Sequence, residues 1–436
     1  MNKIRQQCSL WYEHFLALPR GEQFFRALFW GFFCHLLFFP GGFGIREIMP
    51  VFCAVMLCAY YRYAWRQSNL YMLTARWLFL PYLVLLVVAV AFSLDPLNSL
   101  LHIGRGLNKQ LLIPFIAMEC VRDEKDLRRL LWALVLACLW EGFDCIFQSI
   151  SGFDFIHGAG LHSNRLTGSM GDYWVGNYFA LALTPVFGLW CLLRQRFSRA
   201  TTLLLCAALL APALYGMVFS GVRNALLTLA VITAFAWLYA WSVRWKGLFF
   251  SAVCMLLCAV AVVWFYDTHR LSMESISGDG RWDLWHFAIA VWREYPWFGA
   301  GAGEFNTAFR SLGLVPLKDA ITISHPHDIY LQLLCETGVV GLSLALTSLL
   351  GLLVWVERHM RPFLKEECRK AWGIEQPRPI YWRLTFFFWL GYVAFFINGI
   401  VGHDFFRPWY QLLVFGHLGI AMGAVLAGLR RSRQKE

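Results

Sequence analysis

Charged residues are scarce in this sequence. Only 15% of its 436 residues are Asp, Glu, Lys or Arg, whereas 59% are hydrophobic. Soluble globular domains carry about 25% charged residues, so this composition excludes a soluble globule. The apolar residues gather in runs of about 17 to 25 residues, each long enough to cross a bilayer as a helix. We therefore predict an all-α integral membrane protein, since backbone polar groups in lipid must be satisfied within the spanning structure itself.

The sequence also lacks the common ligand motifs. Its 13 cysteines are scattered, mostly within apolar runs, and no CxxC pair occurs, which argues against a zinc site or a disulfide framework. There is no Gly-rich phosphate loop, DxD motif or histidine cluster, so we expect neither a nucleotide nor a metal cofactor. The first apolar run follows about twenty polar residues without a small-residue cleavage site, so we expect a retained helix rather than a signal peptide.

We predict about twelve membrane helices from the apolar runs. The fourth run is short and contains Pro114 and Glu119, and we keep it because its loss would invert the downstream topology. The predicted spans are 24–42, 45–60, 77–94, 110–121, 130–150, 174–193, 201–219, 224–242, 247–266, 328–356, 382–402 and 409–429.

The distribution of basic residues predicts that both termini are cytoplasmic. In that topology the inward segments hold about 26 of the 38 Lys and Arg residues, as the positive-inside rule requires. The net charge of +11 then reflects topology and attraction to anionic membrane lipids. No nucleic-acid-binding fold accompanies the charge, so we expect no nucleic-acid partner.

This topology divides the chain into three regions. Residues 1–266 form nine transmembrane helices, residues 267–327 form a structured periplasmic loop, and residues 328–436 form three more helices and a basic cytoplasmic tail. Within the loop, a stripe of apolar residues predicts an amphipathic helix that packs on the bundle, lies on the membrane surface or caps a cavity. The stripe consists of Trp282, Trp285, Ile289 and Trp292. A glycine-rich stretch follows at 299–305, and we expect it to be flexible.

Several basic residues remain on the outward side, where positive-inside bias should have removed them. Arg223 lies in a short turn between two apolar helices, where an arginine is costly unless it meets an anion or a water-filled cavity. Its guanidinium fork suits the oxygens of a lipid-linked diphosphate, although an arginine that extends to ordinary headgroups is the alternative. Arg281 opens the loop helix after a glycine-containing segment and could reach inward. Three further residues could join a diphosphate site: Arg105, Lys109 and Arg165.

Titratable residues precede the tenth span. We expect Ser324 to cap this helix and Pro326 to lie in its first turn, which would place His327 at the positive end of the helix dipole. A neutral His327 could accept a proton from an attacking hydroxyl, whereas its imidazolium could stabilise a leaving diphosphate. Asp328 could orient a neighbouring group or simply favour the helix N-terminus. A lone interfacial histidine is more often structural than catalytic. The residues around His327 therefore decide between the two roles.

Two other polar groups are weaker candidates. His403, Asp404 and Arg407 form an outward cluster that could bind a phosphorylated acceptor, but we favour a structural role in holding the last loop. Glu336 lies out of phase with His327 on the predicted helix, so we expect it to face another helix and to serve packing.

The residues from His327 to Gly341 resemble the signature of the O-antigen ligase family. In that signature a His followed by Asn, Ser or Gln precedes a Gly-x-x-Gly motif. Here nine residues separate His327-Asp328 from Gly338-Val339-Val340-Gly341. His325 fits less well, because the same spacing from it would put Glu336 at a glycine position. Asp328 departs from the family, which has an amide or a hydroxyl there.

Two further segments are similar to the family. Arg223, separated by three residues from Leu227, matches a second family motif on an outward turn. The stretches 280–285 and 295–301 are similar to the family's loop segment.

The resemblance implies an inverting enzyme with a C-type glycosyltransferase-like fold. Such an enzyme moves O-antigen polysaccharide from undecaprenyl diphosphate to the lipid A-core at the periplasmic face of the bacterial inner membrane, without a nucleotide or a metal. His327 would be the base for the acceptor hydroxyl or a donor to the leaving diphosphate, and Arg223 and Arg281 would hold the developing charge.

The motifs alone leave other functions open. O-antigen polymerases and protein O-oligosaccharyltransferases share them, although the latter typically carry an added C-terminal domain that we do not expect here. A transporter of lipid-linked glycans would also suit twelve spans, but the two halves look dissimilar and the polar residues gather at one face. The sequence leaves the oligomeric state open.

Overall fold

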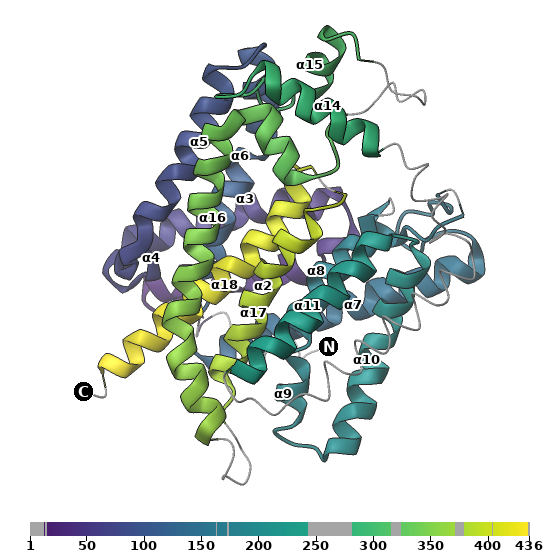
Figure 1. Cartoon of the computed structure of the whole chain (residues 1–436). Coiled ribbons are helices and arrows are strands. Elements are labelled where there is room, and N and C mark those ends of the chain that lie inside the picture. Colours follow the sequence, from purple (N-terminus) through teal and green to yellow (C-terminus); the bar gives the residue numbers. More distant parts are fainter. Residues whose placement is uncertain are drawn as a thin grey trace.

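The structure is a computed structural model of the chain, and it describes residues 13, 15–162, 164–171, 174–242, 281–314, 324–370, 379–402 and 404–434 (Figure 1). Within these residues the regular structure is helical, apart from two isolated bridges, Phe153–Gly160 and His162–Arg165. Eight described helices are long and apolar enough to cross a membrane. The chain is an all-α integral membrane protein, which confirms the predicted fold class.

The described helices follow the predicted apolar runs closely, except at the fourth and tenth. The predicted span 247–266 lies outside the described residues. The helices are α2 (Arg20–Leu37), α3 (Phe43–Ala64), α4 (Asn69–Met72), α5 (Leu80–Ala91), α6 (Pro96–Glu119), α7 (Glu124–Ser151), α8 (Trp174–Val186), α9 (Leu189–Leu193), α10 (Arg199–Phe219), α11 (Arg223–Ser242), α14 (Arg281–Glu294), α15 (Phe305–Ser311), α16 (Ile329–Lys370), α17 (Tyr381–Asn398) and α18 (Pro408–Arg433), with short 3-10 turns η1 to η4 at 39–41, 65–67, 74–79 and 168–170.

The fourth predicted span, 110–121, was wrong in its bounds. The helix there, α6, begins at Pro96, because Asp95 caps it by accepting hydrogen bonds from the next two free N–H groups and because proline suits the first helical position. Its first half carries polar residues, so it does not read as an apolar run. Arg105 and Lys109 therefore lie within a 24-residue helix rather than in a connection.

The tenth predicted span, 328–356, is a longer and broken helix. α16 runs for 42 residues and is interrupted at Gly338, whose φ is 66°. A Cβ at Gly338 would overlap the backbone of Trp297, and one at Gly341 would overlap the side chain of Thr337. Both glycines of the Gly-x-x-Gly motif are therefore required where the chain packs most closely.

The glycine-rich stretch after α14 is held in place, contrary to the expected flexibility. Two of its N–H groups donate to carbonyls just before the break in α16, and two N–H groups just after the break donate back to the preceding turn. These bonds are Ala300 N to Cys335 O (2.9 Å), Gly301 N to Glu336 O (2.8 Å), Val339 N to Pro296 O (2.9 Å) and Val340 N to Trp297 O (3.1 Å). The break is thus satisfied by the loop segment.

α14 forms where the amphipathic helix was predicted, and it packs on the bundle through α16, which was one of the three alternatives. Trp282 is 48% exposed, and Trp285 and Trp292 are half-buried, so the tryptophans are not the most buried residues of the helix. The buried side is small and aliphatic because α14 packs closely on α15 and on the start of α16. It consists of Leu284, Ala288 and Val291.

The bundle has a buried centre and two distinct ends. α8 and α18 are almost entirely enclosed, and α18 lies along α6 while α16 packs on α5 and α17. Figure 1 shows α14 and α15 together at one end of the bundle and the C-terminus at the other. We call the first of these the α14 end. Whether it faces the periplasm stays a prediction.

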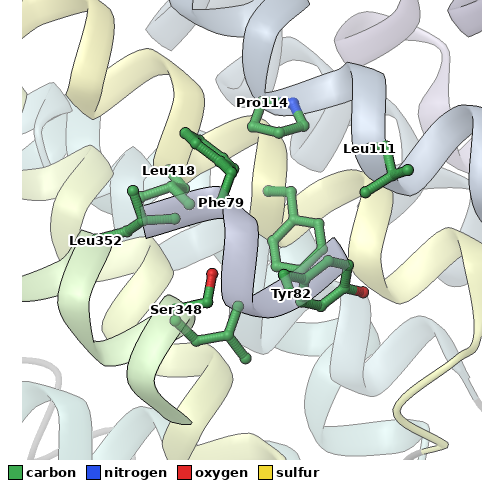
Figure 2. A pocket seen from close by; sticks show the side chains of 9 residues that line it. Phe79, Tyr82, Leu111, Pro114, Ser348, Leu352 and Leu418 are labelled. Atoms are coloured by element: carbon green, nitrogen blue, oxygen red, sulfur yellow. The ribbon is translucent and has the colours of Figure 1, made fainter. Parts of the chain in front are cut away.

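A small apolar hollow lies between η3, α5, α6, α16 and α18. Figure 2 shows Phe79, Tyr82 and Leu111 among its lining side chains. The lining carries no charged residue and none of the predicted site residues. Tyr82 also packs on Phe405, with ring centroids 6.4 Å apart, so the hollow adjoins the α17–α18 connection.

Candidate functional site

His327 lies in an unusual backbone conformation at the start of α16. Its φ is 58°, in the left-handed region that non-glycine residues seldom adopt and that concentrates at functional sites. The N–H of Gly402 donates to the His327 carbonyl at 2.6 Å, and the N–H of Ile329 donates to the Gly399 carbonyl at 3.0 Å. The α17–α18 connection therefore fixes the conformation of His327.

Asp328, rather than Ser324, caps α16. Its Oδ1 accepts hydrogen bonds from the N–H groups of Tyr330 (2.8 Å) and Leu331 (2.9 Å), the pattern of an N-cap. Ser324 and Pro326 lie before the helix, so the predicted roles for both were wrong. Asn and Ser, two of the residues usual at this position in the family, are also favoured N-caps, so an aspartate can serve the same purpose.

Substitutions at Asp328 are expected to follow capping ability. Asp328→Asn should keep the transfer rate and thermal stability close to wild type, because its amide oxygen can accept the same bonds. Asp328→Ala should lower stability by about 1 kcal/mol and loosen the neighbouring His327. Thermal unfolding and transfer rates of the purified variants check this. An Asn variant as impaired as the Ala variant would mean that the negative charge matters, not the cap.

A second histidine and an aspartate accompany His327. The rings of His325 and His327 lie 4.3 Å apart between centroids, and Ser324 Oγ lies 2.9 Å from His325 Nδ1. Asp404 is buried and acts electrostatically on both histidines. The structure thus gathers His325, His327 and Asp404 in one cluster, although they come from two connections of the bundle.

A buried hydrogen-bond network holds Asp404 in place. Gln332 Nε2 donates to Asp404 Oδ1 at 2.8 Å and lies 3.3 Å from a Glu336 carboxylate oxygen. Glu336 also accepts a hydrogen bond from the N–H of Gly303 at 3.1 Å. Glu336 therefore faces the glycine-rich stretch, not simply another helix. Whether its role is only packing stays a prediction.

The cluster favours a neutral His327. Burial lowers its pKa to about 3, helped by the charges of His325, Arg281 and Arg407, while Asp404 opposes the shift. Burial also lowers the pKa of His325, again opposed by Asp404. Burial alone would raise the pKa of Asp404, but His325 and the bond from Gln332 bring it below its usual value. An aspartate that stays ionised beside a neutral imidazole is suited to proton transfer.

The lowered pKa predicts an unusual pH profile. Because His327 is neutral above about pH 3, kcat/KM should stay flat from pH 8 down to about pH 5, since this quantity reports groups of the free enzyme. Measuring kcat/KM across this range, with return to pH 7 as a control for denaturation, checks the expectation. An acidic limb near the ordinary histidine pKa would show that His327 is not the buried base described here.

Arg281 and Arg407 lie close to this cluster. Arg281 begins α14 and Arg407 precedes α18, and the charges of both act on His327. The guanidinium of Arg407 also lies over the ring of Trp174, 4.7 Å from its centroid. This contact with Trp174 helps to hold the loop before α18 in place.

Arg223 reaches the same end of the bundle from α11. Its neighbour Asn224 donates to the Asn398 carbonyl at 2.8 Å, and a Cβ on Gly402 would lie 3.3 Å from Asn224 Nδ2. Because Gly402 binds the His327 carbonyl, the start of α11 lies beside the His327 loop.

The remaining candidates are placed less closely. Arg165 lies beside Leu166, whose N–H donates to the Phe219 carbonyl at 3.4 Å, so it adjoins the turn that leads to Arg223. Arg105 and Lys109 lie in α6, but the side chain of Lys109 is outside the part that the structure describes, as is the whole of His403. In the described ranges, no group of three or more His, Cys, Asp or Glu residues could hold a metal.

Sequence reasoning missed His102 and Gln332. His102 lies one turn before Arg105 on α6 and acts electrostatically on His325 and Asp404. Its spacing from Arg105 would have drawn attention to it had the first half of α6 been recognised as a helix. Gln332 carries no local signal, because a glutamine inside an apolar helix says nothing about its partner in the chain.

Comparison with known proteins supports the resemblance. A search of curated proteins gave no significant match. Residues 208–346, however, match the O-antigen ligase family, and this segment contains Arg223, Arg281, the His325–Asp328 stretch and the Gly-x-x-Gly motif. Residues 208–346 are therefore similar to the O-antigen ligase family, which supports an assignment of the chain to it.

Proposed function

We propose that the protein is an O-antigen ligase that transfers O-antigen polysaccharide from undecaprenyl diphosphate to the lipid A-core, on the periplasmic face of the bacterial inner membrane. The observation that carries the proposal is a buried, neutral His327 with the charges of Arg281 and Arg407 beside it, inside the family segment. Lipid-linked polysaccharide is the substrate class of the O-antigen ligase and polymerase superfamily. The periplasmic orientation rests on the distribution of Lys and Arg.

The proposed reaction is a direct displacement at the anomeric carbon of the donor. A hydroxyl oxygen of the acceptor bonds to this carbon while the bond from the carbon to the diphosphate oxygen breaks, which inverts the configuration. His327 accepts the hydroxyl proton, which its neutral imidazole can do. Undecaprenyl diphosphate leaves with one more negative charge than it carried in the donor.

The leaving diphosphate needs positive charge that is already in place. Arg281 begins α14 next to His327, and Arg223 begins α11 beside the loop that binds the His327 carbonyl. Two guanidinium groups held by separate helices would stabilise the developing charge without reorganising during the reaction. Arg165 lies near enough to the Arg223 turn to assist.

Glycolipid analysis of a strain that lacks the gene tests the choice of acceptor. Loss of a ligase should leave polymer stranded on undecaprenyl diphosphate. Loss of a polymerase should instead leave single repeats attached to the core, and that result would overturn the ligase assignment while keeping the same site chemistry. Transport would gain support only if purified protein moved labelled glycan across vesicles without transferring it.

A further inference from the structure

A polar face runs along α6, which starts near the α14 end of the bundle. Asn98, His102, Arg105 and Lys109 are spaced by four, three and four residues, which places them on one face of the helix. Asn98 Nδ2 donates to Glu304 Oε1 at 2.5 Å, within the glycine-rich stretch. This face therefore begins at the segment that clamps α16.

His102 joins this face to the histidine cluster. A Cβ on Gly303 would lie 2.8 Å from His102 Cγ, so only glycine leaves room for the ring. The ring also meets Phe406 edge-on, with centroids 5.9 Å apart, and the N–H of Phe406 donates to Asp404 at 2.9 Å. His102 Nε2 is buried and has no hydrogen-bond partner among the described residues, so a donor or acceptor of a ligand could pair with it.

Arg105 lies further along α6, at the border between this polar face and an exposed apolar side of the helix. It is the tenth residue of the helix, about 14 Å along the axis from Pro96. It is exposed, and no described carboxylate pairs with it. Leu97 and Leu101, which are 66% and 55% exposed, precede it on the outer side. An unpaired arginine at this depth is costly unless an anion meets it.

Arg281 and His102 both act electrostatically on the histidine cluster. Arg281 is among the charges that act on His327, whereas His102 acts on His325 and Asp404. A direct displacement requires the attacking hydroxyl and the leaving diphosphate to lie on opposite sides of the reacting carbon. If Arg223 and Arg281 hold the diphosphate, the acceptor must approach from the opposite side. We assign α6 to that side because His102 packs against the loop that carries Asp404.

We propose that His102 and Arg105 bind a phosphate group of the glycolipid acceptor, which reaches the site sideways from the periplasmic leaflet along α6. The inference rests on the proposed function, because it takes the direction of attack from it. The guanidinium of Arg105 would bind the phosphate at the lipid boundary. The ring of His102 would bind the same phosphate beside the histidine cluster. The acceptor hydroxyl would then be delivered towards His327.

Kinetics and binding with rough lipopolysaccharide as the acceptor test this inference. Arg105→Gln and His102→Ala should each raise the acceptor KM about tenfold, since a hydrogen bond to a charged group is lost, while the donor KM stays unchanged. Arg105→Lys should recover part of the loss. Binding of rough lipopolysaccharide without donor should weaken by the same factor. Leu101→Ala, on the same helix, is the matched control and should bind normally.

Dephosphorylated acceptor separates phosphate recognition from a structural effect. The acceptor KM of wild type should be about tenfold higher for this substrate than for the phosphorylated acceptor. Arg105→Gln should raise it no further. An equal effect of the substitution on both acceptors, or a change confined to the donor KM, would overturn the inference. Binding is measured in neutral and in anionic nanodiscs. If the dependence on Arg105 vanishes in phosphatidylglycerol, ordinary headgroups occupy the site, which also overturns it.

The two proposals fail in distinguishable ways. Wild type that extends only lipid-linked repeats would overturn the ligase assignment. In that case a tenfold higher KM of Arg105→Gln for the diphosphate-bearing acceptor would still support phosphate recognition, and an unchanged KM would overturn it.

Discussion

Replacing His327 is expected to lower the transfer rate about 10²- to 10⁴-fold, the usual contribution of a positioned general base. The imidazole is neutral at physiological pH because burial and neighbouring positive charges lower its pKa to about 3. The backbone of His327 also has a strained, left-handed conformation, which hydrogen bonds to the α17–α18 connection hold in place. Initial rates at saturating donor and acceptor measure the loss.

The choice of variant matters because His327 has a positive φ. Asparagine adopts the left-handed region more readily than alanine, so His327→Asn keeps the loop while removing the base. His286→Ala is the matched control, since His286 is an exposed histidine on the neighbouring α14. His327→Asn protein that folds normally and transfers glycan at the wild-type rate would remove His327 from the mechanism.

Arg223→Ala and Arg281→Ala are each expected to slow transfer by roughly 30- to 1000-fold. Each removes one preorganised positive group from the leaving diphosphate, worth about 2 to 4 kcal/mol of transition-state stabilisation. The loss should fall mainly on kcat, because the charge develops as the bond to the diphosphate oxygen breaks. Single-turnover rates at equal protein levels measure it.

A control on the same helix makes the arginine test specific. Arg293→Ala removes an exposed arginine near the other end of α14 and should leave the rate unchanged. Wild-type rates in both Arg223→Ala and Arg281→Ala would end the proposed charge stabilisation. If only Arg281→Ala slowed transfer, His327 would remain the site of the reaction. Arg223 would then be excluded from stabilising the leaving diphosphate.

Much of the site was predictable where the chemistry is local in sequence. The His327–Gly341 stretch pointed to the candidate base and contained both glycines of the motif, but the helix break at Gly338 and the close packing that requires the glycines were not predicted. A polar N-cap for α16 was predicted, but the prediction chose Ser324, which lies four residues before the actual cap, Asp328. A proline between two histidines suggested a helix start, yet the chain turns once more before α16 begins.

What could not be predicted depends on contacts between distant segments. The buried face of α14 is set by α15 and α16, so its own apolar pattern did not reveal which of its residues are most buried. Asp404 and Gln332 meet only because the α17–α18 connection folds over the start of α16. The predicted span for α6 was too short because the polar face of the helix, which includes His102 and Arg105, interrupts the hydrophobic run on which span prediction depends.

The most direct measurement is transfer in vitro with purified protein, undecaprenyl-diphosphate-linked glycan and rough lipopolysaccharide, with EDTA in every reaction. The account predicts slower-migrating lipopolysaccharide with wild type and with His286→Ala, and none above background with His327→Asn. Product with His327→Asn at the wild-type rate, or longer lipid-linked glycan from donor alone with no modified lipopolysaccharide, would contradict it.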